Sequence, residues 1–324
     1  MLRKILAFYT RYFTLWVVLF GVVAYFWPAP FAAVGTYRFT EHLSANKLFF
    51  SVTMFGIGAV LQIGDFERIL RKPIIVLIGS CAQFIIMPIG AFLVAKIFGL
   101  EAAIAAGLIL TGSAPGAMAS NVMSYIAKAD TAYSVSLTTV STLLCPILTP
   151  GLTYLLARSA MNVNFWAMVL DILIMVIIPL FFGFGVRHYF KEKIEKILPV
   201  FPAISVTFII FICSVVIALN KDRFGDVTLL ILAAVVLLNI YGMSAGYGVG
   251  RVFGMSRTRR RTLSIEIGMQ NAGLGVVLAK EHLSDEATIP AAFFVFVCII
   301  TASIMAAYWQ RRDACAAKIN TSNI

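Results

Sequence analysis

The chain has 324 residues, of which 60% are hydrophobic and 13% charged, and its mean hydropathy is +0.93. These values lie far outside the range of soluble globular domains, so soluble enzymes and soluble binding modules are excluded and a membrane protein is predicted. The net charge of +11 would suggest a nucleic-acid ligand in a soluble protein. In a membrane protein its distribution along the chain describes topology instead.

Apolar stretches long enough to cross a bilayer recur along the whole chain. About 20 residues are needed to cross roughly 30 Å of hydrocarbon. The first run, at about 14–27, follows three basic residues and is compatible with a secretory signal peptide cleaved near PAPFAA, but further spans follow, so it serves equally well as the first of them. The sequence predicts ten spans, at about residues 12–28, 46–64, 73–98, 101–127, 131–157, 163–187, 199–219, 226–250, 260–280 and 287–310.

The basic residues divide unevenly between the two sides that these spans define. The side of the amino terminus receives 19 of the 26 cations and the opposite side six, while Lys96 falls near the end of the third span. This split follows the positive-inside rule if both termini are cytoplasmic. The 19 are Arg3, Lys4, Arg11, Arg68, Arg71, Lys72, Lys128, Arg187, Lys191, Lys193, Lys196, Arg251, Arg257, Arg259, Arg260, Arg261, Arg311, Arg312 and Lys318.

The ten spans divide into two halves of five. The first half starts on the cytoplasmic side and the second half starts on the opposite side, so the sequence predicts an inverted-topology repeat joined near residues 158–164. The fourth and ninth spans hold corresponding positions in the two halves, and both are interrupted by polar or helix-breaking residues. Interruptions at corresponding positions indicate a transporter's binding site.

The fourth span reads ILTGSAPGAMASNVM and is predicted to break at Gly112 to Gly116. Pro115 cannot donate a backbone hydrogen bond, and the glycines lower the cost of non-helical backbone. The half-helix that begins near Ala117 would present free amides to an anion, and the carbonyls freed on the other side would suit a cation. The alternative is a kink that serves only packing. Ser120 and Asn121, directly after the break, favour the binding interpretation.

Glu266 is the strongest single candidate in the sequence. Of 15 acidic residues, only Asp171 and Glu266 stand well inside apolar runs. A carboxylate at the centre of a membrane helix costs about 2.5 to 3.5 kcal/mol, so such a residue is a functional candidate by default. Asp171 is either a satisfied structural acid or a group that pairs with a cavity water or a neighbouring hydroxyl, and the sequence leaves both interpretations open.

The neighbours of Glu266 in SIEIGMQNAGLG favour a cation site. Gln270 and Asn271 add amide oxygens, and Gly268 and Gly273 loosen the helix, so the segment offers the oxygen ligands that hard cations prefer. The alternative is a salt bridge from the carboxylate to Arg260 or Arg261.

The fifth span places Ser134, Thr138 and Ser141 on one helical face, and a short loop brings that face near Asn121. Gln83 is a lone amide in the third span, and such residues most often join helices. The three histidines, His42, His188 and His282, fall in predicted loops, and the five cysteines show no metal-ligand spacing. No combination of residues typical of an enzyme is present, so the chain is predicted not to be an enzyme.

At these residues the chain resembles the bile acid:sodium symporter family, specifically its bacterial ten-helix members. The resemblance covers nearly the whole chain and is carried by TLWVVLFGVVAYF, MFGIGAVLQIGDF, AQFIIMP, GSAPGAMASNVMSYIAKADTAYSVSLTTVSTL, IEIGMQNAGLGVVLA and AAYW. It implies a core domain of spans 3 to 5 and 8 to 10, at 73–160 and 223–312, with broken, crossing fourth and ninth helices. It also implies a panel domain at 1–72 and 161–222 and a cytoplasmic tail at 313–324.

The resemblance also implies binding residues. Two sodium ions would bind near the crossing, the first through Ser120, Asn121, Ser134, Thr138 and Glu266, and the second through Gln83, Glu266, Ile267, Met269 and Gln270. The substrate would lie beside Asn271 and the half-helix amides at Gly116, Ala117, Met118 and Ala119. In the tenth span, Cys298 and Ile299 stand where some relatives carry a polar pair, which leaves the identity of the substrate open.

Together these features predict a sodium-coupled symporter in a bacterial inner membrane, with both termini cytoplasmic. Its cargo would be an organic anion, either bile-acid-like or a small carboxylate such as pantoate or pantothenate. A proton-coupled carrier with Glu266 as the titrating group is the alternative within the same class. An intramembrane enzyme or a receptor would also place polar groups in the membrane, but the sequence offers neither a nucleophile with its base nor a signalling domain.

Overall fold

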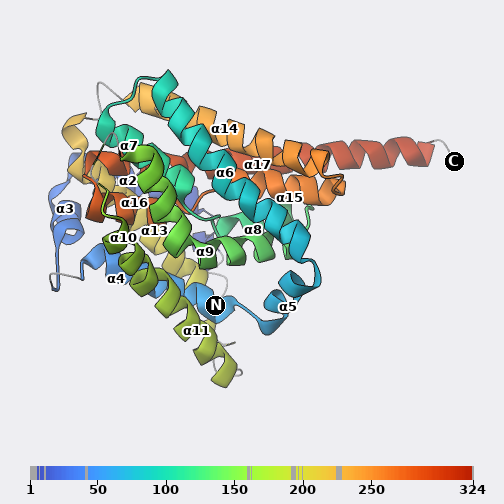
Figure 1. The fold of residues 1–324 in the computed structure, drawn as a ribbon, viewed down its shortest axis with the longest axis horizontal. Coiled ribbons are helices and arrows are strands. Elements are labelled where there is room, and N and C mark those ends of the chain that lie inside the picture. The colour runs from blue at the N-terminus through green and yellow to red at the C-terminus, as the bar shows by residue number, and fades with distance from the viewer. Residues whose placement is uncertain are drawn as a thin grey trace.

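The computed structural model describes residues 6–322 apart from 7, 11, 41–42, 159–160, 162, 191–194, 196, 199 and 224–227. The described residues form helices and no strand, as the hydropathy predicts (Figure 1). The helices are α2 (Phe13–Phe26), α3 (Ala29–Thr36), α4 (Ala45–Val60), α5 (Ile63–Arg71), α6 (Pro73–Ile97), α7 (Ala102–Ser113), α8 (Ala119–Ile126), α9 (Thr131–Ala157), α10 (Phe165–Ile172), η1 (Leu173–Ile177), α11 (Ile178–Tyr189), α13 (Val200–Leu219), η2 (Lys221–Arg223), α14 (Thr228–Val252), α15 (Arg257–Gly268), α16 (Ala272–His282), η3 (Glu286–Thr288) and α17 (Ile289–Ser322).

Six described helices are long and apolar enough to cross a membrane, and eight candidate spans result if each of two bent pairs counts as one. The bent pairs are α2 with α3, at 100°, and α4 with α5, at 73°. The remaining predicted spans, 101–127 and 260–280, correspond to the pairs α7–α8 and α15–α16, whose members are short. Both segments are therefore interrupted, as their proline, glycine and polar residues predict.

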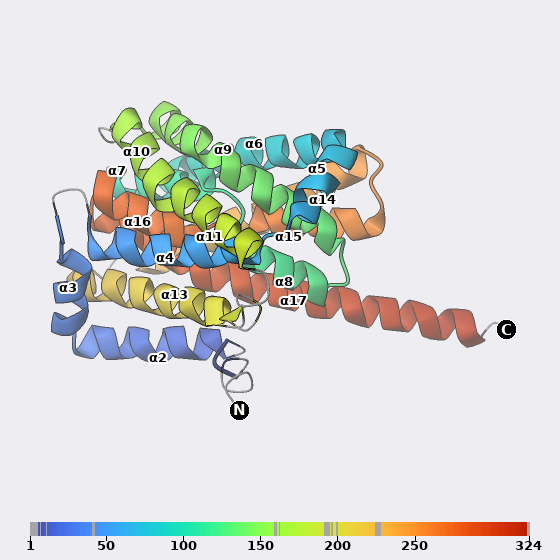
Figure 2. The same ribbon diagram turned by 90° about the horizontal axis from the view of Figure 1, so that it is seen from below.

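The helices pack as a bundle in which α2 contacts α13, α13 contacts α4 and α4 contacts α11. Figure 2 shows α2, α13 and α4 lying one above the other on one side of the bundle. The other elements pack around α6, α7, α9 and α14, and α17 continues beyond the bundle to Ser322. The predicted tail at 313–324 therefore begins as a continuation of the last helix.

The sixth predicted span contains a feature that hydropathy does not reveal. A π-helical turn, η1, separates α10 from α11, and the Ile178 amide donates to the Leu173 carbonyl. Pro179 follows directly and has no N–H to donate to the preceding turn, so a wider turn absorbs the irregularity.

Several predictions fall partly outside the described residues. The basic residues Arg3, Lys4, Arg11, Lys191, Lys193 and Lys196 lie there, as do His42 and the side chains of Arg223 and Lys318. The loop assignment of the other two histidines is wrong, because His188 and His282 belong to the last turns of α11 and α16. Both sit where a cationic side chain interacts favourably with a helix carboxyl end.

Candidate ion- and substrate-binding site

The two broken helices meet at their interruptions. The segment between α7 and α8 and the segment between α15 and α16 form an isolated antiparallel bridge, Gly116 with Gln270. The Ala117 amide donates to the Met269 carbonyl at 2.9 Å, and the Asn271 amide donates to the Pro115 carbonyl at 2.8 Å. Non-helical backbone at membrane depth needs internal partners, and here each break supplies them for the other.

Neighbouring helices hold the ends of the half-helices. Thr149 on α9 donates to the Ser113 carbonyl at 2.7 Å, where α7 ends. The Asn239 amide on α14 donates to the Gly268 carbonyl at 2.7 Å, where α15 ends. Asn239 is a further site residue beyond those predicted, and its signal in the sequence is an asparagine that follows a run of valines and leucines. Both carbonyls would otherwise be helix-end groups without partners.

Glu266 lies at the centre of this arrangement, in the last turn of α15, and is 2% exposed. Ser120 of α8 donates to its Oε2 at 2.6 Å, and Ser134 of α9 donates to the same oxygen at 2.8 Å. Thr138 donates to Oε1, and its hydroxyl oxygen lies 3.2 Å from the Asn121 amide oxygen. The structure thus brings together all five residues of the first predicted set.

The alternative of a salt bridge from Glu266 to Arg260 or Arg261 is wrong. Arg261 forms two hydrogen bonds with Asp313, each at 2.7 Å, and the Arg260 side chain donates to the Met255 carbonyl. Within the part of the chain that the structure describes, Glu266 has no lysine, arginine or histidine within ion-pairing distance. A buried carboxylate with hydroxyl donors and no cationic side chain is suited to a bound cation.

Gly116 leaves room for the Glu266 carboxylate beside the first break. A Cβ at this position would lie 2.6 Å from Glu266 Oε1, closer than real side-chain contacts allow. The Gly116 amide also points to Ser141 Oγ, at 3.3 Å, so the predicted hydroxyl face of α9 contacts the break directly.

The second predicted set also gathers at the crossing. Gln83 Nε2 donates to Gln270 Oε1 at 2.7 Å, and Gln270 Nε2 donates to the Ile267 carbonyl at 3.0 Å. The Gln83 amide oxygen is buried and has no hydrogen-bond partner. A buried amide oxygen is costly to leave without a partner, so this oxygen is suited to bind a cation.

The residues predicted to bind substrate are placed in two regions. Asn271 caps α16 by accepting from the Leu274 amide at 3.2 Å, and the segment Gly116 to Ala119 lies across from it in the bridge. Cys298 on α17 is 3% exposed, and its thiol donates to the Val295 carbonyl of its own helix at 3.4 Å, while Ile299 is partly buried.

Two aromatic residues pack over the start of α16. Phe50 of α4 and Phe208 of α13 contact each other, with ring centroids 5.4 Å apart, and both are buried. A ring atom of each lies within 4 Å of a Cβ built on Gly273, which is in the first turn of α16.

Asp171 is part of a charged cluster that connects three helices. The Lys47 ammonium of α4 lies 2.7 Å from its carboxylate, and His282 of α16 lies 2.9 Å from the same oxygen. Lys47 also lies 3.6 Å from Glu281. The interpretation of Asp171 as a satisfied acid is therefore confirmed, and the partners that the structure shows are the side chains of Lys47 and His282.

Comparison with known proteins gives consistent results. The model of the Sodium Bile acid symporter family matches residues 47–226. The uncharacterized sodium-dependent transporter YocS of Bacillus subtilis (strain 168) is 37% identical over 311 residues, which are 96% of this chain and 94% of that protein. The probable chloroplastic sodium/metabolite cotransporter BASS1 of Arabidopsis thaliana is 36% identical over 81% of this chain and 65% of that protein. Sodium/bile acid cotransporter 4 of Mus musculus is 26% identical over 71% of this chain and 54% of that protein.

Proposed function

Because this chain belongs to the sodium bile acid symporter family, we propose that it is a sodium-coupled symporter that imports an organic anion. The observation that carries the proposal is the environment of Glu266. This carboxylate is buried, accepts hydrogen bonds from three hydroxyl groups and has no cationic side chain near it among the described residues. Sodium prefers such oxygen ligands, and its charge would offset that of the buried carboxylate.

We assign two sodium ions to the two sets of oxygens at the crossing. The first ion would use Ser120, Asn121, Ser134, Thr138 and Glu266. The second would use Glu266 together with Gln83, Gln270 and the carbonyl groups of Ile267 and Met269. The unpaired oxygen of Gln83 supports the second site. The carboxyl ends of α7 and α15, which carry the negative ends of the helix dipoles, also point into the crossing and favour cations.

We infer an anionic substrate from the opposite ends of the same helices. The amino ends of α8 and α16 carry the positive ends of the helix dipoles, which favour an anion. The segment from Gly116 to Ala119 and the side chain of Asn271 would contact the anion, with Cys298 and Ile299 on the neighbouring helix. Relatives named for bile acid and for metabolites support this class, and bile-acid-like anions and small carboxylates such as pantoate or pantothenate are the candidates.

We propose that transport proceeds by alternating access between two domains in a ten-span architecture with two inverted halves. The core would comprise α6 to α9 and α14 to α17, and the panel α2 to α5, α10, η1, α11 and α13. The contact of Asp171 with His282 of α16 and the packing of Phe50 and Phe208 over Gly273 of α16 would join panel to core and close one side of the space between them. Sodium binding would stabilise the crossing, and displacement of the panel would expose the substrate to the cytoplasm.

Two sodium ions and one monovalent anion carry a net charge of +1 across the bilayer. A membrane potential of 100 mV would then assist each cycle by about 2.3 kcal/mol. Uptake into vesicles should therefore increase with an inside-negative potential.

The decisive experiment replaces Glu266 with glutamine in proteoliposomes and measures sodium-driven uptake of a labelled organic anion. We expect loss of sodium-driven uptake, because the neutral amide cannot balance the cations. Glu67→Gln is the matched control, since this glutamate is exposed on α5 and should leave transport unchanged. Sodium-driven uptake by Glu266→Gln at the wild-type rate would contradict the proposal.

A proton-coupled carrier predicts a different result. Replacement of sodium by choline at fixed pH should abolish uptake if sodium is the coupling ion, and leave it intact if Glu266 carries a proton. A thermal-shift screen of organic acids with and without sodium would identify the cargo, because the correct anion should stabilise the protein only when sodium is present.

A further inference from the structure

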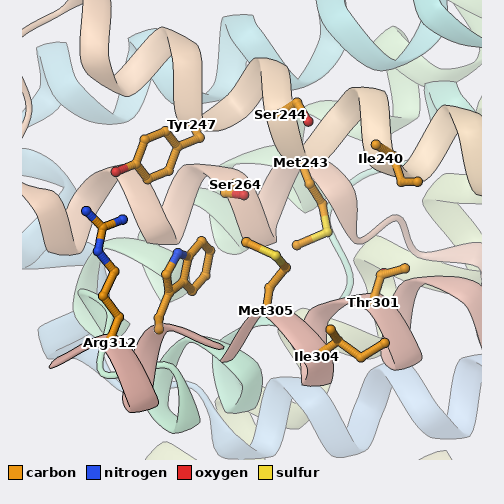
Figure 3. A pocket seen from close by; sticks show the side chains of 10 residues that line it. Ile240, Met243, Ser244, Tyr247, Ser264, Thr301, Ile304, Met305 and Arg312 are labelled. Atoms are coloured by element: carbon orange, nitrogen blue, oxygen red, sulfur yellow. The ribbon is translucent and has the colours of Figure 1, made fainter. Parts of the chain in front are cut away.

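An apolar groove lies between α14 and α17 and is floored by α15. It has a volume of about 510 Å³, which is in the range of ligand sites in proteins. Its walls include Ile240 and Met243 from α14 and Ile304 and Met305 from α17 (Figure 3). Methionine side chains adapt to irregular apolar ligands. None of these residues belongs to the proposed sodium or substrate sites.

The groove is open at the surface of two candidate membrane spans, α14 and α17. Ile240 and Ile304 are 50% and 62% exposed, and both lie within candidate membrane spans. Exposed isoleucines in a span contact lipid chains in a bilayer. A ligand of this groove therefore enters from the membrane and not from water.

The two ends of the groove differ in polarity. Figure 3 shows Ile240 and Thr301 at one end and Tyr247 with Arg312 at the other. Arg312 follows Ile304 by eight residues on the same helix, which corresponds to a rise of about 12 Å. Tyrosine and tryptophan are typical of the depth of lipid headgroups, and Trp309 stacks on Tyr247 at the polar end, with ring centroids 6.5 Å apart.

Arg312 is available for an anion. It is exposed and, within the described part of the chain, forms no ion pair, whereas the neighbouring Arg261 is bound to Asp313. Other arginines surround this end of the bundle, at Arg251 in the last turn of α14 and Arg257 at the start of α15.

We propose that this groove binds an anionic phospholipid, with one acyl chain between α14 and α17 and the phosphate at Arg312. The order of the residues along the groove, from apolar to aromatic to cationic, matches the order of groups along such a lipid. Basic pockets between membrane helices bind anionic headgroups through the same combination of contacts. The site lies on the lipid-facing side of α14 and α17, so it is independent of the sodium coupling proposed above.

The test uses the full chain in nanodiscs or under native mass spectrometry. Binding of phosphatidylglycerol is compared with that of phosphatidylcholine for the wild type, for Arg312→Gln and for Arg311→Gln. Arg311 is the matched control, because it is an exposed arginine one position away that does not line the groove. A phosphatidylglycerol with a photoreactive group in its acyl chain then maps the contact in the wild type, so the result does not depend on the folding of a variant.

We expect preferential binding of phosphatidylglycerol and a loss of about fivefold in Arg312→Gln, the contribution of one arginine near an anionic headgroup. Arg311→Gln should bind as the wild type does, and the label should attach to residues near Met243 and Met305. Equal binding of the two lipids, equal losses in the two variants, or labelling elsewhere would overturn the proposal. Cross-links between two copies of the chain through this groove would also overturn it, because they would identify a second protomer as the occupant.

Discussion

Substitution of Gly116 by alanine tests whether the position of the Glu266 carboxylate matters for sodium binding. The added Cβ would lie 2.6 Å from Glu266 Oε1, whereas ordinary contacts begin near 3.4 Å, so the carboxylate must retreat by about 0.8 Å. Gly116 has a negative φ, so the new methyl group adds no backbone strain of the left-handed kind. The expected effect is therefore displacement of the carboxylate from its three hydroxyl donors.

Overpacking of this kind typically costs about 1 to 3 kcal/mol. If the sodium-bound state bears that cost, the sodium concentration for half-maximal uptake should rise by about five- to 150-fold. Uptake in proteoliposomes over a sodium titration measures this directly, and sodium-dependent thermal stabilisation gives an independent value. Gly185→Ala in α11 is the control, because nothing lies within 4 Å of its new Cβ. An unchanged sodium dependence in folded Gly116→Ala would refute the argument that the carboxylate is held at this distance for sodium.

Three further substitutions test other contacts of the site. Gln83→Leu removes the unpaired amide oxygen from the second proposed site, and the Hill coefficient for sodium should fall toward one in uptake titrations, since the coefficient is limited by the number of coupled sites. Asn239→Ala leaves the Gly268 carbonyl without its partner and should lower the free energy of unfolding by about 1 to 3 kcal/mol. Denaturation in detergent measures this change, and a neutral effect would argue against a role of Asn239 in holding the end of α15. Lys47→Met should destabilise the protein more than the double variant Lys47→Met with Asp171→Asn does, because the single change leaves the Asp171 carboxylate without the Lys47 ammonium. Additive effects in a double-mutant cycle would exclude coupling between the two residues.

Local sequence predicts much of the site because helix breaks have local causes. Pro115 and its glycines predict an interruption at 112–116, and α7 ends at Ser113. The second half-helix begins at Ala119, two residues later than predicted, because Gly116 and Ala117 pair with the other break instead of joining the helix. Glu266 is identifiable as a functional candidate from its rarity alone, since few acids stand inside apolar runs.

Contacts between distant segments are not available from local patterns. Asp171 is equally compatible with a structural and a functional interpretation until Lys47 and His282 are seen beside it, and these residues come from different helices. The salt bridge from Glu266 to the nearby arginines is reasonable by spacing, but Asp313, far along the chain, is the partner of Arg261. The role of Asn239 is not evident from its local sequence, because its partner is a backbone carbonyl of another helix.

The sequence by itself determined that this is a helical membrane protein, where the fourth span breaks and which carboxylate is buried, because hydropathy, proline and glycine act over a few residues. Its motifs also identified the resemblance to a sodium symporter family. Only the tertiary structure decided that the two breaks hydrogen-bond to each other and that three hydroxyls from two helices surround Glu266. The physical reason is that a buried polar group must find a partner, and in a bundle of helices that partner can come from any neighbouring segment.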